Sequence, residues 1–193
     1  MTTNFDPNKV LLTGENPFIR LADSPDGRVT TNASFWRVVL SPKGPGCVLF
    51  ITSELTEGDW RIYSDNIALT RWLQNTVQGV LNAELRDTDI QVIDADFEHT
   101  GDLRSFWTEH VHSDDEDLAL TWYDIGQPAL RHTQPFSQPD RPYGSASILI
   151  PCAGARLTLN GEQANGYPQP REWDGLEFSS CALAFAESWT EWP

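Results

Sequence analysis

The sequence predicts a mainly β protein, built as an antiparallel β-barrel or a curved β-sandwich with one long helix. Roughly ten short segments alternate apolar and polar residues or are wholly apolar, and turn residues separate them. Only residues 65–85 show the spacing of an amphipathic helix, and a single helix argues against a doubly wound parallel sheet. With 193 residues and 39% hydrophobic content the chain can form a sizeable core, so we expect a single β-rich domain over residues 1–193.

The first half of the chain predicts an antiparallel meander followed by the helix. The residues up to about Glu15 are polar, and we expect them to be loosely held. The expected strands cover residues 17–22, 28–40, 47–52 and 59–63, with turns such as Ser24-Pro25-Asp26-Gly27 between them. The helix is expected to follow an N-cap at Ser64 or Asp65. Its apolar stripe, which we expect to be buried, consists of Leu69, Trp72, Leu73, Val77 and Val80.

The second half predicts further strands at 89–99, 104–112, 118–123, 143–150, 156–160 and 176–189. Two Pro-rich stretches, 127–142 and 165–174, are expected to be loops, and Asn160-Gly161 has the chemistry of a tight hairpin turn. Along the last strand Leu183, Phe185 and Trp189 are expected on one face. The other face carries only small side chains, which predicts a closely packed element or a bound molecule beside Ser180, Ala182, Ala184, Ala186 and Ser188.

The chain is strongly acidic, with 28 acidic against 13 basic residues and a formal net charge of −15. Such a surface repels nucleic-acid phosphates and anionic membranes, so we expect neither as a partner, whereas a basic protein partner stays open. The three cysteines have no metal-type spacing, and Cys47 and Cys181 lie in apolar runs. Residues 1–10 lack the features of a signal peptide, and no apolar run has the length of a membrane span. We therefore predict a cytoplasmic protein.

The stretch 105–123 is the one place where two histidines lie side by side in the chain. His110 and His112 are two residues apart, so on a strand both imidazoles face the same way. With Glu116 they form the spacing H-x-H-x-x-x-E, which resembles the first metal-binding motif of the cupin family. The resemblance implies a metal held by these side chains on a jelly roll, with His132 in the place of that family's last histidine.

Other motifs limit or extend these interpretations. The chain departs from the cupin pattern at Arg104, where that motif begins with glycine, and the alternative is a pair of partly exposed strand histidines beside a solvated acidic turn. Gly58-Asp59-Trp60 resembles the lipocalin fingerprint, but it follows several predicted strands, so we expect Trp60 to be a core residue. The sequence has no motif of serine hydrolases, P-loop NTPases, Rossmann oxidoreductases or zincins.

Three carboxylates, Asp94, Asp96 and Glu98, share one face of the strand predicted at 89–99. If that face turned into a barrel, burial would raise the pKa of at least one of them and make it a general acid or base. Pairing with the strand at 104–112 would then place the carboxylates beside the histidines. If the face meets solvent, the three charges serve solubility alone.

These observations lead to the hypothesis that a β scaffold encloses a pocket for a small, partly apolar molecule. The catalytic candidates are His110, His112, Asp94 and Asp96. The ligand-binding candidates are Glu98, Trp107, Trp122 and His132. The chemistry would be proton transfer without an organic cofactor, as in an isomerase, dehydratase or cyclase, with a metal ion at His110 and His112 as a variant. The alternative is an acidic binding module, immunity- or inhibitor-like, that masks a basic partner.

Overall fold

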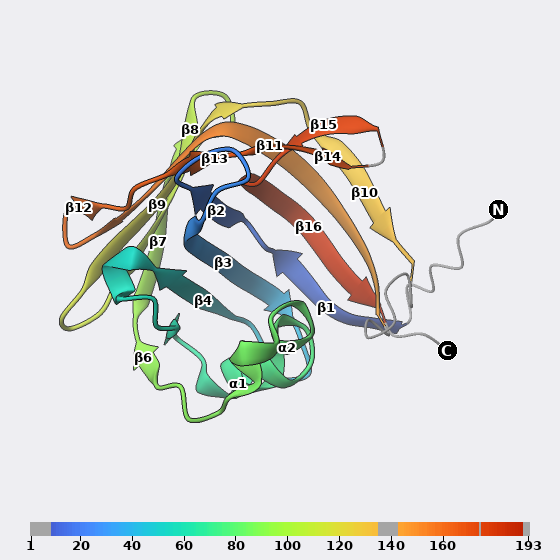
Figure 1. Ribbon diagram of the computed structural model, residues 1–193. Coiled ribbons are helices and arrows are strands. Elements are labelled where there is room, and N and C mark those ends of the chain that lie inside the picture. Colours follow the sequence, from blue (N-terminus) through green and yellow to red (C-terminus); the bar gives the residue numbers. More distant parts are fainter. Residues whose placement is uncertain (1–8, 135–142, 174, 191–193) are drawn as a thin grey trace.

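A computed structural model describes residues 9–134, 143–173 and 175–190 of the chain (Figure 1). The helices are α1 (Ile67–Asn75) and α2 (Gln78–Leu81), with short 3-10 helices at Glu54–Thr56 and Ala83–Arg86. The strands are β1 (Val10–Glu15), β2 (Phe18–Ala22), β3 (Val29–Leu40), β4 (Gly46–Ser53), β5 (Arg61–Ser64), β6 (Val92–Asp94), β7 (Asp96–Asp102), β8 (Phe106–His112), β9 (Asp117–Ile125), β10 (Ala129–Thr133), β11 (Gly144–Leu159), β12 (Glu162–Gln163), β13 (Tyr167–Pro168), β14 (Pro170–Trp173), β15 (Leu176–Ser179) and β16 (Ala182–Thr190). The predicted mainly β fold class is therefore confirmed. Among the residues that the structure describes, no helix is long and apolar enough to cross a membrane.

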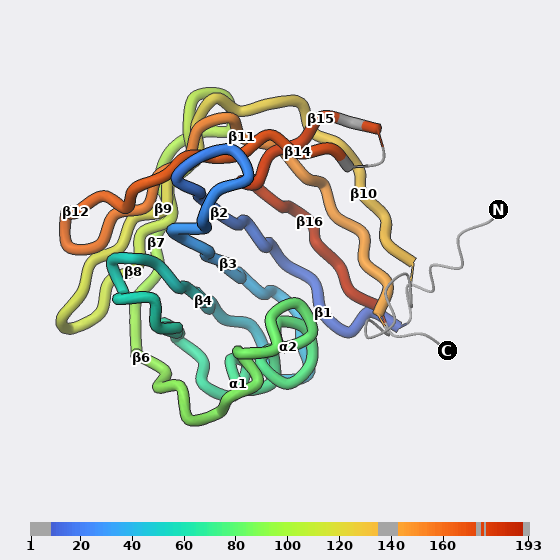
Figure 2. Tube along the Cα trace, viewed as in Figure 1, coloured from blue at the N-terminus to red at the C-terminus, as the bar shows by residue number. Residues whose placement is uncertain are grey.

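Most strands belong to one large, strongly curved sheet. Its main path runs β6-β5-β4-β3-β1-β16-β11-β9-β8-β7. The pairing of β5 with β6 is parallel, and the other neighbours on this path are antiparallel. The two ends of the path, β6 and β7, are separated in the chain only by Ala95. The stretch 92–102 therefore bridges both edges of a sheet that curls back on itself, which makes a curved sandwich rather than a clean barrel (Figures 1 and 2).

The curved sheet buries apolar side chains on both of its faces. Alternation along β3 shows this directly, because Phe35 points to one side and Trp36 to the other and both are fully buried. An inner cluster lies between the two halves of the sheet and includes Phe35, Leu49, Leu120, Trp122 and Leu183. An outer cluster packs the helical segment against β3, β4 and β5 and includes Trp36, Phe50, Ile62, Leu69 and Leu73.

The predicted helix is present, but a different residue caps it. Asn66, not Ser64 or Asp65, is the N-cap, because its Oδ1 accepts a hydrogen bond from the backbone N–H of Leu69 at 3.0 Å. Asp65 instead accepts the backbone N–H of Cys47 at 2.7 Å, which ties the entry of the helix to β4.

The helix is bent between α1 and α2. The Thr76 hydroxyl donates to the Trp72 carbonyl at 2.6 Å, a side-chain bond of the kind that bends helices. Gly79 lies so close to the preceding turn that a Cβ there would be 2.0 Å from the Gln74 carbonyl oxygen. Within the predicted stripe the fully buried residues are Leu69, Leu73 and Val77. Trp72 and Val80 are only partly buried, because they lie at the solvent edge of the stripe, so the expectation of full burial is wrong for these two.

Several segments differ from the prediction. Residues 10–15, expected to be loosely held, form β1 in the middle of the sheet between β3 and β16. The described part of the expected loop 127–142 contains β10, and the expected loop 165–174 contains β13 and β14. The strands expected at 143–150 and 156–160 are one continuous strand, β11. In each case pairing with a neighbouring strand supplies the stabilisation that the local pattern does not reveal.

The predicted last strand is broken into β15 and β16, and a β-bulge interrupts β16. Ala186 has a φ of 50°, and the register between β16 and β11 shifts beside it. A bulge reverses the alternation of side chains. Leu183 and Phe185 therefore face the inner cluster, whereas Trp189 belongs to the outer one, and the expectation that these three share a face is wrong.

Candidate functional site

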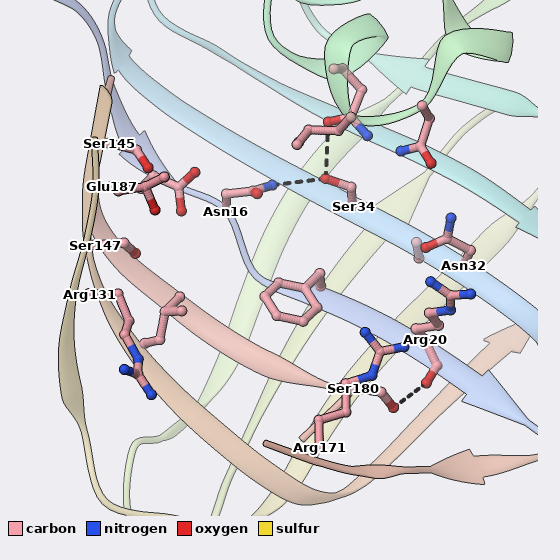
Figure 3. Close-up of a pocket in the computed structure, with 17 residues that line it drawn as sticks. Asn16, Arg20, Asn32, Ser34, Arg131, Ser145, Ser147, Arg171, Ser180 and Glu187 are labelled. Carbon is pink, nitrogen blue, oxygen red and sulfur yellow. Dashed lines mark hydrogen bonds between the residues drawn. The ribbon is translucent and has the colours of Figure 1, made fainter. Parts of the chain in front are cut away.

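A cavity of about 300 Å³ lies on the outer face of the sheet, between α2 and the β14–β15 hairpin (Figure 3). We call it the saddle pocket. Strands β2, β3, β11 and β16 form its floor, and β10 and β14 contribute side walls. Its polar and charged lining residues are Asn16, Arg20, Asn32, Ser34, Gln78, Asn82, Arg131, Thr133, Ser145, Ser147, Arg171, Ser180 and Glu187. Its apolar lining residues are Phe18, Ala33, Leu81 and Leu149.

Three arginines surround the saddle pocket. Arg131 lies on one side, and Arg20 and Arg171 lie together on the opposite side (Figure 3). The Arg131 guanidinium is 5.9 Å from the ring centroid of Phe178. Within the described parts of the chain, neither Arg20 nor Arg171 forms an ion pair. Among the described residues that line the pocket, Glu187 is the one carboxylate against three arginines, so this lining is locally positive in an otherwise acidic protein.

Ser147 presents a hydroxyl to this pocket although it is only 6% exposed. Its Oγ has no hydrogen-bond partner among the residues that the structure describes. The nearby Ser180 hydroxyl, by contrast, donates to the Arg20 carbonyl at 2.6 Å and accepts the Gln169 backbone N–H at 2.8 Å. A buried hydroxyl without a partner is costly and is uncommon in native proteins. Ser147 therefore offers a preformed hydrogen-bonding group to a bound molecule.

A hydrogen-bonded network of side chains fixes one end of the pocket. Asn16 Nδ2 donates to Ser34 Oγ at 2.9 Å, and Ser34 Oγ donates to Gln78 Oε1 at 3.3 Å (Figure 3). Gln78 Oε1 also accepts the indole N–H of Trp36 at 3.0 Å. Because Asn16, Gln78 and Trp36 are buried, these bonds hold α2 rigidly against the sheet at the rim of the pocket.

Glu187 reaches the saddle pocket because of the bulge in β16. Without the extra residue, strand alternation would turn this carboxylate to the inner face. Its Oε1 accepts the Trp189 indole N–H at 2.7 Å, and the residue is only 8% exposed. Earlier on the same strand Ala182 and Ala184 pack with Phe178. The face with only small side chains predicted a closely packed neighbour of this kind.

The predicted catalytic residues of the histidine hairpin lie on another part of the molecule. The register pairs Asp96 with His112 and Glu98 with His110, so these carboxylates do lie beside the histidines. The two imidazole rings are parallel with centroids 6.1 Å apart, and His112 Nδ1 is 2.7 Å from Asp117 Oδ1. Asp96, Glu98 and His112 are exposed, and none of these residues lines the saddle pocket. Their catalytic role stays a prediction.

Glu116, the third residue of the cupin-like spacing, is held by other partners. It accepts a hydrogen bond from the Arg61 guanidinium and another from the Tyr63 hydroxyl at 2.6 Å. Burial, with a further contribution from the bond to Glu116, raises the pKa of Tyr63 well above its ordinary value. Across the described residues, no group of three or more His, Cys, Asp or Glu side chains is placed to hold a metal ion. A metal at the two histidines stays a prediction.

A second cavity, of about 730 Å³, is acidic, and we call it the acidic hollow. Its carboxylates belong to Asp59, Asp94, Asp114, Asp115 and Glu116. Asp94 therefore lies in this hollow, apart from its predicted companion Asp96. Trp60, expected in the core, is only partly buried and lines the same hollow.

The residues predicted to bind a ligand are dispersed over the fold. Trp122 is fully buried in the inner cluster, and its indole N–H donates to the Phe18 carbonyl at 3.0 Å. Trp107 is partly buried and stacks on the ring of His99 with centroids 4.7 Å apart. His132 is exposed on β10. None of these side chains lines the saddle pocket, and their role in binding stays a prediction.

Glu109 is a fully buried carboxylate that the sequence interpretation missed. Its carboxylate accepts a hydrogen bond from the Arg37 guanidinium at 2.5 Å and another from the Trp107 indole N–H at 2.8 Å. Burial outweighs these favourable contacts and raises the pKa of Glu109 to about 7. Burial likewise raises the pKa of Glu15, whose carboxylate lies 3.5 Å from the same guanidinium. Because Glu109 lines neither the saddle pocket nor the acidic hollow, we interpret this network as structural.

No local motif in the sequence indicates the saddle pocket. Its residues come from segments as distant in the chain as Asn16 and Glu187. Arg20 lies between the buried Ile19 and Leu21, a pattern typical of a solvent-facing strand residue. The run of small residues near the end of the chain, which begins at Ser180, was the one sequence feature that indicated space for a bound molecule. Ser180 does line the saddle pocket.

Comparisons of the chain with protein-family models, curated proteins and solved structures found no significant match. The functional proposal is therefore based on the arrangement of the residues in this structure.

Proposed function

We propose that this protein binds a small polar molecule carrying an anionic group, a phosphate or a carboxylate, in the saddle pocket. The observation that carries the proposal is the meeting of three arginines around one cavity in a chain of net charge −15. A guanidinium binds such oxyanions through two parallel charge-assisted hydrogen bonds. The overall field of the protein repels anions, so a local cluster of arginines is required for anion binding at this point.

The remaining lining suits the body of such a molecule. The Ser147 hydroxyl and the amide oxygen of Asn16 can bind hydroxyl or amine groups, whereas the amide nitrogen of Asn16 already donates to Ser34 and to the Phe35 carbonyl. Phe18 and Leu149 add apolar surface, and a cavity of about 300 Å³ fits a metabolite-sized ligand. If the ligand is also converted, Glu187 is the carboxylate that faces it and would exchange the proton.

Calorimetric titration at low ionic strength with inorganic phosphate, glycerol 3-phosphate and succinate tests the proposal. We expect binding of at least one of these anions. The Arg20→Gln/Arg171→Gln variant should weaken that binding by about tenfold or more, since charge-assisted hydrogen bonds are lost.

The matched control is Arg104→Gln/Arg156→Gln, which removes the same charge at exposed positions outside the saddle pocket. The control should keep the affinity of the wild-type protein. Failure of the wild-type protein to bind any of the three anions, or an equal loss in the control, would show that the proposal is wrong.

Binding of a basic protein partner is a second candidate function, favoured by the acidic hollow. Its five carboxylates face one cavity, and Arg61, the one arginine among the described residues of its lining, forms an ion pair with Glu116. Such association is expected to be fast and to weaken steeply with salt. Pull-down at low salt should retain a basic protein on the wild-type chain and lose it from Asp94→Asn/Asp114→Asn/Asp115→Asn. Equal retention by both proteins would exclude the acidic hollow as the binding surface.

We propose that the protein is cytoplasmic, since free cysteines are typical of reducing compartments. Cys47, Cys152 and Cys181 are free and buried. Burial raises the pKa of Cys47 and Cys152 to about 12 and that of Cys181 to about 11. The thiols therefore stay protonated at neutral pH and react slowly with oxidants. Labelling with a thiol reagent should be slow in the folded protein and fast in urea.

A further inference from the structure

Arg20 and Arg171 lie between two cavities. One is the saddle pocket, and the other, of about 270 Å³, lies beside the turn that joins β2 and β3. We call this second cavity the turn hollow. Both cavities are lined by Arg20, Arg171 and Ser180. The other residues of the turn hollow are Ala22, Asp26, Gly27, Val29, Gln169 and Pro170.

The backbone around Ser180 holds the two arginines close to each other. The Arg20 N–H donates to the Ser180 carbonyl at 3.2 Å, and the Ser180 N–H donates to the Gln169 carbonyl at 2.9 Å. The Ser180 hydroxyl adds its bonds to the Arg20 carbonyl and the Gln169 N–H. Residue 20 and the start of β14 are therefore fixed on either side of Ser180, and two guanidinium groups face a shared space (Figure 3).

These two like charges are not paired with a carboxylate in the described structure. No ion pair of Arg20 or Arg171 is present there. An anion between the two guanidinium groups removes their repulsion and gains charge-assisted hydrogen bonds from both. The unpartnered Ser147 hydroxyl then marks where the remainder of the molecule binds in the saddle pocket.

The place of the arginine pair decides which kind of anion fits. A carboxylate or a phosphomonoester ends a molecule, so it would leave one of the two cavities empty. A phosphate diester is an anion with a substituent on each side. We infer that the ligand is a small phosphodiester, with its phosphate between Arg20 and Arg171 and a hydroxyl-bearing group in each cavity. This inference rests on the proposed function and narrows its ligand.

Both cavities can bind the hydroxyl groups of such substituents. The saddle pocket offers the Ser147 hydroxyl and the amide oxygen of Asn16. In the turn hollow the Asp26 carboxylate and the Gln169 amide are acceptors for hydroxyl hydrogens. The Asp26 carboxylate repels an anion placed within the turn hollow itself, which favours the phosphate at the junction.

Titration with three probes tests the inference: inorganic phosphate, glycerol 3-phosphate and glycerophosphoglycerol, its diester with a second glycerol. The diester is expected to bind about tenfold more tightly than glycerol 3-phosphate, although it carries less negative charge, because its second glycerol adds contacts. Arg20→Gln/Arg171→Gln should weaken the binding of both.

A variant that fills only the turn hollow separates this inference from the proposed function. Val29→Tyr enlarges a residue that lines the turn hollow and not the saddle pocket. It should abolish the preference for the diester and leave the affinity for glycerol 3-phosphate unchanged. The control Val39→Tyr makes the same change at an exposed position of the same strand outside both cavities and should leave the preference intact.

The outcomes are distinguishable. If the diester binds no more tightly than glycerol 3-phosphate, or if Val29→Tyr keeps the preference, the inference is wrong while the proposed function stands. If the wild-type chain binds none of the three probes (inorganic phosphate, glycerol 3-phosphate and glycerophosphoglycerol), the inference is wrong. Titration with succinate then tests the proposed function separately: binding of succinate would leave the proposed function standing, and no binding would show that it is wrong as well.

Discussion

Arg37 on β3 and Glu109 on β8 form an ion pair with their charged groups 2.5 Å apart across the interior of the curved sheet. The two strands are not neighbours in the sheet, so this pair joins its two halves directly. Arg37 also lies 3.5 Å from Glu15, so a single guanidinium serves two carboxylates. Because the Glu109 side chain is fully buried, its charge is costly even with this partner.

The raised pKa of Glu109 predicts that stability falls as the pH rises from about 4.5 to about 7. In this range the folded state keeps a proton on Glu109 that the unfolded state has released. This proton on Glu109 contributes roughly 3 kcal/mol to the free energy of unfolding. The contribution is fully present below pH 4.5 and is lost above about pH 7. The raised pKa of Glu15 acts in the same direction.

Urea unfolding at about pH 5 and about pH 8 measures this dependence of stability on pH. The Glu109→Gln variant should lose less stability between the two pH values than the wild-type protein. The exposed Glu98→Gln should behave as the wild-type protein does. An equal pH dependence in the wild-type protein and Glu109→Gln would contradict the raised pKa.

Ser147 and Ser180 are expected to respond oppositely to replacement by alanine. Ser147→Ala removes a buried hydroxyl that has no partner among the described residues, so the free protein should be as stable or up to about 1 kcal/mol more stable. Ser180→Ala removes bonds to Arg20 and Gln169 and should cost roughly 1–3 kcal/mol. Thermal unfolding of both variants measures the difference. Destabilisation of Ser147→Ala to the same extent would show that its hydroxyl is already bonded in the free protein.

The helical stripe predicts different costs for two adjacent residues. Leu73 is fully buried in the outer cluster, so Leu73→Ala should lower the free energy of unfolding by roughly 2–5 kcal/mol. Trp72 is only partly buried, so Trp72→Ala should cost less than the roughly 3–5 kcal/mol of a buried tryptophan. Chemical denaturation of the two variants compares them. A larger loss for Trp72→Ala than for Leu73→Ala would place the helix in another orientation on the sheet.

The bulge at Ala186 predicts a stabilising glycine. A non-glycine residue at a φ of 50° is strained, and Ala186→Gly should raise the free energy of unfolding by about 1 kcal/mol. Ala184→Gly, the same change on the same strand in regular β conformation, should lower it by about 0.5–1 kcal/mol. Measured melting temperatures that move in the same direction for both variants would argue against the bulge.

Local patterns were sufficient to predict most of the elements. Alternation along 28–40 matches β3, and the apolar run 47–52 matches β4, because side-chain period and burial are linked in a strand. Asn160-Gly161 forms the expected tight turn, with φ of 51° and 82° at its two residues. The apolar stripe was enough to predict the helix between residues 67 and 81. Its bend depends on contacts of Thr76 and Gly79, which the hydrophobic pattern does not show.

The sequence by itself thus determined the fold class and the net charge. It predicted one strand at 89–99 beside the strand of the histidines, but that segment is interrupted at Ala95, so only β7 pairs with β8 and β6 pairs with β5. Tertiary structure alone decided which polar side chains meet. The bulge at Ala186 turns Glu187 toward the saddle pocket, and the curvature of the sheet brings Arg131 opposite Arg20 and Arg171. Register, bulges and curvature arise from pairing between segments far apart in the chain, so no local pattern encodes them and side chains that line one cavity look like unrelated surface residues.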